Sequence, residues 1–285
     1  MIAGRAPSWR WGALIAAGMV ASVLPVPGQL VFAAGAVAVL GLPHGASDLA
    51  VVPGPRRVSF LLAYGLVILA VLGLWLMAPP IALVGFLVLS AVHFAIDGRD
   101  VDLASDRNAG WGLGALLVAG PALLHRQALS GLFASVVQPE AATMLAGAMQ
   151  VVAIVALVPV IRALMADRPI TGSSRVEVIV GLAATLILPP LVGFACGFVL
   201  LHARGQTLER QRDLGCASLR DYGHRIAPVL LGAVMVLAGV VLLFTRIALD
   251  GTAMLFACIA ALAVPHMLVT PLWRRERYGN AVLAG

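Results

Sequence analysis

Charged residues are scarce in this chain, and lysine is absent altogether. Of its 285 residues only 11% are charged, whereas 61% are hydrophobic. A soluble domain carries about 25% charged and 45–50% apolar residues, so this chain cannot cover a water-facing surface. Without lysine it can neither hold a chromophore through a Schiff base nor form a Walker A motif. The composition therefore excludes a soluble domain, a covalent retinal-binding opsin and a P-loop NTPase.

Cysteines are few, and positive charge is not gathered into a stripe. Cys196, Cys216 and Cys258 have no CxxC spacing, and we interpret them as small apolar fillers. The net charge of +6 comes from arginines that lie mostly between apolar runs. This is the pattern of loops that set membrane topology, so we expect no nucleic-acid partner.

Apolar runs long enough to cross a membrane recur along the chain, since a spanning helix needs about 20 such residues. A further apolar stretch, 110–125, is short and broken by Gly and Pro, and 127–138 has an interfacial or re-entrant character. We expect 204–226 to be a polar loop. The sequence thus predicts an all-α polytopic transmembrane bundle, a single membrane domain over 1–285 with one re-entrant or interfacial segment. The eight spans are expected at 11–27, 30–52, 58–78, 80–97, 141–164, 176–202, 227–247 and 252–272.

The arginines favour eight spans over nine. With nine spans the 19 arginines divide almost evenly between the two sides. With eight spans, and 110–138 left on the cytoplasmic side, they divide fifteen to four. Cytoplasmic loops carry an excess of Arg and Lys. We therefore expect a bacterial inner-membrane protein with both termini in the cytoplasm.

Four of the six histidines lie inside or at the end of predicted spans: His44, His93, His202 and His266. In the eight-span topology each lies in the second half of a helix that runs toward the cytoplasm, so all four share one membrane depth. Ionisable groups inside a bilayer are costly and usually functional, and neutral imidazoles bind iron, copper or zinc well. The residues alone leave a metal centre, a proton relay and a polar packing cluster open.

Two acids accompany these histidines at helical spacing. Asp48 follows His44 by four residues, and Asp97 follows His93 by four. A metal-bound histidine usually donates its second N–H to a carboxylate or carbonyl. Each acid is therefore a candidate to orient the histidine of its own or of a neighbouring helix. For Asp97, near a span end, a water-facing or arginine-paired role is an equal alternative.

Around these residues the chain resembles the Brp/Blh family of microbial membrane β-carotene 15,15'-dioxygenases. The run Pro43-His44-Gly45-Ala46-Ser47-Asp48 matches the family's strongest signature. Further landmarks follow in order over residues 38–270: His93-Phe94 before Asp97, Pro189-Pro190-Leu191 leading to His202, and Pro265-His266-Met267.

The resemblance implies a membrane enzyme that holds Fe(II) through His44, His93, His202 and His266 and cleaves carotene with O2. The carotenoid would lie in an apolar tunnel open to lipid, for which Phe94, Phe194, Met267 and Trp273 are our candidates. One position departs from the family pattern: Gln206 stands where members commonly have a second histidine, four residues after His202.

Three functions follow as hypotheses. The first is an Fe(II) dioxygenase that cleaves β-carotene or a related carotenoid to retinal. The second is a diverged relative that acts on another isoprenoid lipid or is catalytically inactive. The third is a transporter or proton pathway that uses the intramembrane His and Asp residues.

Overall fold

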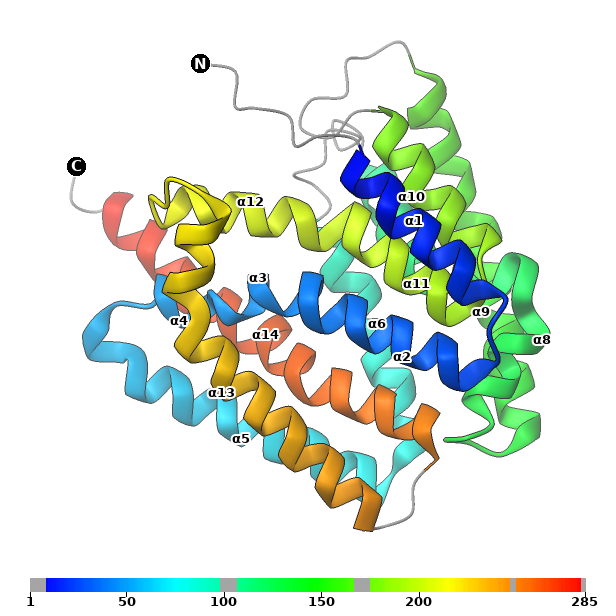
Figure 1. Ribbon diagram of the computed structural model, residues 1–285, viewed down its shortest axis with the longest axis horizontal. Helices are drawn as coiled ribbons and strands as arrows, with labels where there is room; N and C mark the ends of the chain where they lie inside the picture. Colours follow the sequence, from blue (N-terminus) through cyan, green and yellow to red (C-terminus); the bar gives the residue numbers. More distant parts are fainter. Residues whose placement is uncertain (1–8, 98–106, 167–174, 247–249, 283–285) are drawn as a thin grey trace.

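The structure is a computed structural model that describes residues 9–97, 107–166, 175–246 and 250–282. Throughout these ranges the regular structure is helical, so the predicted all-α class is confirmed (Figure 1). The α-helices are α1 (Trp9–Ser22), α2 (Val26–Ala36), α3 (Leu42–Ala46), α4 (Asp48–Val51), α5 (Arg57–Met77), α6 (Pro79–Asp97), α7 (Arg107–Ala119), α8 (Ala122–Phe133), α9 (Pro139–Met165), α10 (Arg175–Ile187), α11 (Pro190–Phe198), α12 (Arg204–Asp213), α13 (Leu219–Arg246) and α14 (Gly251–Val282). Two π-helical turns, η1 (Val37–Gly41) and η5 (Val199–Ala203), and a 3-10 turn, η2 (Gly54–Arg56), complete the order.

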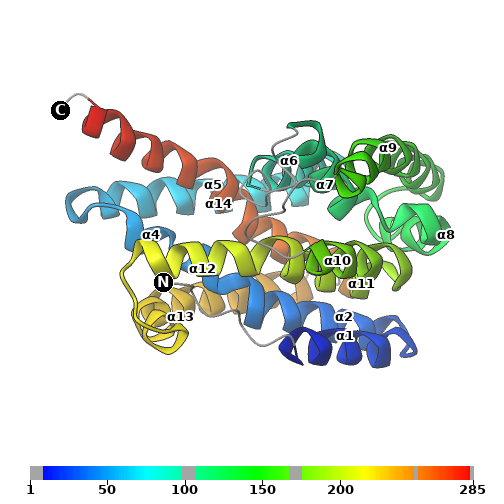
Figure 2. The same ribbon diagram turned by 90° about the horizontal axis from the view of Figure 1, so that it is seen from above.

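Among the described residues, seven helical runs are long and apolar enough to cross a membrane, which supports a polytopic membrane protein. They are Val26–Ala50, Gly54–Met77, Pro79–Asp97, Pro139–Met165, Pro190–Asp213, Leu219–Arg246 and Gly251–Trp273. The first predicted span is shorter than expected: α1 ends at Ser22, and α2 starts anew behind Pro25. Figure 2 shows α1, α2 and α13 along one face of the molecule and α5, α6 and α9 along the other.

The predicted single span at 176–202 is in fact an antiparallel pair, α10 and α11. The chain turns at Pro189, which can neither continue the ladder of α10 nor leave its preceding residue helical. A side chain at Gly193 would lie 2.9 Å from the carbonyl oxygen of Ala184, and one at Gly181 would meet Leu201. Small residues thus bring the two helices into close contact.

The path of α7 and α8 also differs from the expected re-entrant segment. Gln150 of α9 donates to the carbonyl oxygen of Leu123 at 3.4 Å, and Ser130 and Thr143 share a hydrogen bond of 3.1 Å. Near the other end of α9, a side chain at Gly112 would meet Ala156 and Pro159. The α7–α8 pair therefore runs antiparallel to α9 along most of its length.

The two differences from the expected topology offset each other, so the direction of the helices from α11 onward is unchanged. If α7–α8 crosses the layer, α9 runs opposite to the expected direction, and the α10–α11 turn then reverses the chain once more. As a result α11 still runs toward the side where α3, α6 and α14 end, as the eight-span topology requires (Figure 1). The expected loop at 204–226 continues this helix as α12 to Asp213 before α13 starts at Leu219.

Helix α7 is largely enclosed by protein, because α6 and α9 pack against it. Nine of its thirteen residues are buried. At Gly114 an added Cβ would lie 2.7 Å from the carbonyl oxygen of Ala91, so only glycine allows this approach of α7 to α6. The α6–α7 contact holds in place the helix α6, which carries His93.

Candidate active site

The structure brings the four predicted histidines together. Their ring centres are 5.2 Å apart for His44 and His202, 5.1 Å for His44 and His266, and 5.2 Å for His93 with both His202 and His266. Each pair meets nearly edge to face, and all four rings line one cavity. The four side chains come from α3, α6, η5 and α14, which are far apart in the sequence.

Irregular helix geometry places two of these rings. His44 follows the π-helical turn η1 and Pro43, and His202 lies within the π-helical turn η5. A π-turn widens the helix locally and rotates the residues that follow it, and such turns recur at functional sites. The Pro43 carbonyl oxygen accepts a 2.7 Å hydrogen bond from Tyr222 of α13, which ties this irregular segment down.

The arrangement fits a metal ion. Nδ1 of His44 and Nε2 of His202 are buried and have no hydrogen-bond partner in the described part of the chain. A buried ring nitrogen without a partner is costly unless something binds it. Two imidazoles that bind one ion at ~2.1 Å would have ring centres about 4.5–5.2 Å apart, and the four measured ring-centre distances lie at the upper end of this range. Among the described residues, the group whose donor atoms all lie within 4.8 Å of one another is His93, Asp97 and His202. Imidazole donors suit iron, zinc and copper alike.

Asp48 holds His266 rather than the histidine of its own helix. His266 Nδ1 donates to Asp48 Oδ2 at 2.6 Å, and Thr270 Oγ1 donates to the same oxygen at 2.7 Å. Arg210 Nη2 donates to Asp48 Oδ1 at 3.2 Å. Both ion-pair side chains are only 2% exposed. In the neutral form of a histidine that donates through Nδ1, Nε2 carries the lone pair and is the nitrogen that can bind a metal.

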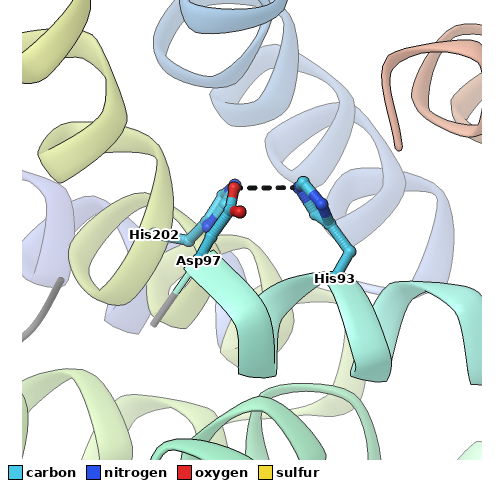
Figure 3. Close-up of side chains that lie close together, drawn as sticks. All are labelled: His93, Asp97 and His202. Carbon is cyan, nitrogen blue, oxygen red and sulfur yellow. Dashed lines mark ion pairs between the residues drawn. The ribbon is translucent and has the colours of Figure 1, made fainter. Parts of the chain in front are cut away.

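Asp97 lies on the other side of the histidine group. Its Oδ2 is 3.4 Å from His93 Nε2, and Figure 3 shows its carboxylate beside the His202 ring and facing His93. One donor atom from each of the three residues lies within 4.8 Å of the others. This placement allows Asp97 to serve as a metal ligand itself, in addition to the orienting role expected from the sequence.

These features come together in a known family. A model of the β-carotene 15,15'-dioxygenase family matches residues 35–274. The chain belongs to this family. The match extends from α2 into α14 and includes all four histidines, Asp48 and Asp97. Comparison with curated proteins finds no match, and neither does comparison with solved structures.

In this member of the β-carotene 15,15'-dioxygenase family, the position of Gln206 does not interrupt the histidine group. Gln206 is buried one helical turn beyond His202 but is not among the residues that line the cavity. His44, His93, His202 and His266 line the cavity without residue 206. The departure from the family pattern therefore leaves four imidazoles at the site.

The cavity has a volume of about 620 Å³, within the 300–1,000 Å³ of small-molecule sites. Three of the four tunnel candidates line it: Phe94, Phe194 and Met267. Trp273 does not, because it packs against the far side of Phe60 with ring centres 5.8 Å apart. Apart from the four histidines, the polar side chains of the lining are Asp48, Tyr64 and Ser90, so most of the cavity wall is apolar and suits an apolar molecule.

Sequence reasoning missed three residues at the site. Phe198 lies 5.6 Å from the His202 ring, ring centre to ring centre. Arg210 pairs with Asp48, and Tyr64 lines the cavity and donates to the Leu262 carbonyl oxygen at 3.1 Å. The spacing offered a signal for Phe198, which stands four residues before His202 and so shares its helix face.

Proposed function

We propose that this protein is an Fe(II)-dependent dioxygenase that cleaves β-carotene, or a related carotenoid, at the central double bond to form retinal. The observation that carries the proposal is the group of four imidazoles that line one mostly apolar cavity in a member of this family. The reaction balances without a further reductant: the C=C bond breaks, and each carbon takes one oxygen atom of O2.

His44, His93, His202 and His266 are the proposed ligands, and bound iron would supply the activation of O2. Asp48 positions His266 through the 2.6 Å hydrogen bond. Arg210 neutralises the Asp48 carboxylate in a site that water does not reach. Such partners of metal-bound histidines fix ring orientation and raise ligand basicity. His44 and His202 have buried nitrogens free to bind.

The apolar part of the cavity is the proposed binding site for the polyene. Phe94 packs edge to face against His202 at 4.8 Å, and Phe194 stacks on Phe198 at 5.9 Å, ring centre to ring centre. Aromatic faces beside the histidines suit a conjugated chain through offset stacking. The same walls keep bulk water from the reacting carbons.

We propose that the histidine side of the bundle faces the cytoplasm of a bacterium, with both termini there. The support is the arginine distribution. Among the described arginines, only Arg126 and Arg246 lie in the half opposite to the ends of the histidine-bearing helices. This bias is stronger than the one expected from the sequence, because the reversal of α9 moves Arg162 and Arg175 to the arginine-rich side.

Expression in a bacterial host that accumulates β-carotene tests the function. Wild type, His44→Ala and His224→Ala are compared at matched membrane expression, with retinal and β-carotene quantified by chromatography. His224 lies on α13 and is exposed, outside the cavity, and is the matched control. We expect retinal from wild type and His224→Ala and none from His44→Ala.

Well-expressed wild type that forms no retinal would refute the proposal. The iron content of the purified protein then separates the alternatives. Bound iron that is lost in His44→Ala would indicate a relative acting on another isoprenoid lipid. Absence of any metal would favour a proton or solute pathway.

A further inference from the structure

Helix α13 is attached to the bundle at its two ends and stands off in the middle. Its buried residues are Tyr222 and Ile226 near the start and Val240 and Phe244 near the end. Tyr222 and Ile226 pack with Ala46 of α3, and the later pair belongs to the central core. No residue from 227 to 239 is buried. About three and a half turns of helix thus contact the bundle only through partly buried side chains, among them Val229, Leu230 and Leu237.

This partly exposed middle stretch of α13 forms one wall of the histidine cavity. The residues of α13 that line the cavity repeat at intervals of four along one helix face, in two adjacent rows. Several of them are small, which keeps the wall thin. They are Pro228, Val229, Gly232, Ala233, Val236 and Leu237.

The cavity is open beside α13. Leu61 of α5 and Val236 of α13 line the cavity and are nevertheless 50% and 38% exposed. Ala34 of α2, Pro228 and Gly232 likewise line it and are exposed. The rim formed by these five residues carries no charge. Figure 1 shows α13 crossing the bundle between α2 and α5. Because these helices are candidate spans, the openings face lipid rather than water.

We propose that the middle of α13 is the doorway through which a long, unsubstituted hydrocarbon chain passes sideways from the lipid to the four histidines, with Gly232 setting its width. The identity of the hydrocarbon as a carotenoid rests on the proposed function. The doorway itself requires only the cavity, its apolar rim and a lipid-soluble molecule. A polar or charged solute would have no partner on this rim and would not pass.

Two glycines on the same helix provide a matched test. A Cβ added at Gly232 or at Gly239 meets no atom within 4 Å, and both residues are exposed. Only Gly232 lines the cavity. Leucine at either position should therefore fold equally well and improve helix propensity equally. Gly232→Leu fills the doorway, whereas Gly239→Leu only adds a side chain to the lipid-facing surface.

Chemical modification of a native cysteine can measure passage through the doorway without any catalysis. Cys258 of α14 lines the cavity and is 5% exposed, whereas Cys196 and Cys216 do not line it. With these two replaced by alanine, the rate at which N-phenylmaleimide modifies Cys258 is measured by mass spectrometry of the protein in lipid nanodiscs. The lipid-soluble reagent must reach the thiol through the cavity.

We expect Gly232→Leu to slow the modification about tenfold, which corresponds to about 1.4 kcal/mol of added barrier, because the leucine side chain narrows the opening. Gly239→Leu should react at the rate of the parent. Equal rates for the parent and Gly232→Leu would overturn the doorway. An equal slowing in Gly239→Leu would also overturn it, as would a failure of the reagent to modify Cys258 in every variant.

Cleavage assays on the same variants separate this inference from the proposed function. Retinal formation that falls in Gly232→Leu but not in Gly239→Leu, at equal iron content, supports both. If the wild type forms no retinal but Cys258 is modified more slowly in Gly232→Leu, the doorway is supported and the proposed function is refuted. Undiminished retinal formation by Gly232→Leu would keep the function and reject the doorway.

Discussion

Replacing Asp48 by asparagine should weaken iron binding and destabilise the fold, and the structure gives the size of each effect. The Asp48 carboxylate accepts hydrogen bonds from His266, Thr270 and Arg210. An amide of the same shape has only one acceptor oxygen. If that oxygen stays with His266 and Thr270, the NH2 group faces Arg210, whose buried charge then has no counter-charge from residue 48.

Two magnitudes follow for Asp48→Asn. Loss of a partner that orients a metal-bound histidine typically costs 10- to 100-fold in metal affinity, or about 1.4–2.7 kcal/mol. Loss of one member of a buried ion pair costs about 3–5 kcal/mol of stability. We therefore expect a clear fall in the thermal midpoint and iron binding weaker by one to two orders of magnitude in the fraction that remains folded.

The assay is an anaerobic Fe(II) titration against a competing chelator, on purified protein in detergent, with thermal unfolding measured in parallel. Thr270→Val is the isosteric control, because it removes one hydrogen bond to Asp48 and leaves the contact between Asp48 and His266 intact. Its iron affinity should stay close to that of wild type. Wild-type iron affinity in folded Asp48→Asn would refute the positioning role, as would an equal loss in Thr270→Val.

Three further outcomes are expected. Gln206→Ala should retain full iron content, because Gln206 does not line the cavity, and iron lost from this variant would make it a ligand. Gly114→Ala should lower the thermal midpoint by overpacking α7 against α6, at about 1–3 kcal/mol, whereas Gly131→Ala, which meets open space, should not. Arg204→Gln breaks a 2.6 Å pair with Glu177 whose side chains are partly exposed, and unfolding measurements should show a loss of about 1 kcal/mol or less.

The sequence predicted the class of fold and the histidine group because both depend on local patterns. Long apolar runs identify a membrane bundle whatever their exact ends. The sequence could place the histidines at one depth because each lies in the second half of a span that runs toward the same side of the membrane, and hydropathy and charge bias indicate both the spans and their direction. The pairing of Asp48 with His266 was foreseen only as one of two options, because spacing does not tell which neighbouring helix packs closest.

The path of the chain was harder to predict for a physical reason. Hydropathy measures how apolar a segment is and not whether it turns, so the apolar run across Pro189 looked like one span. Conversely, α7 is shielded by protein rather than lipid and needs less apolar character, so its Gly-rich sequence looked too polar to cross. Arg210 looked like a loop charge, since its partner Asp48 lies 162 residues away in sequence.

The two π-helical turns also bear on how this chain should be aligned with its relatives. A π-turn is equivalent to one residue inserted into an α-helix, and each residue of an α-helix turns the chain by about 100°. A relative that lacks the extra residue in Val37–Gly41 or Val199–Ala203 would present a different position to the cavity from there onward. Deleting one residue from either turn would rotate His44 or His202 by about 100° relative to the preceding helix, and an alignment with a relative that lacks the turn should place its single-residue gap there.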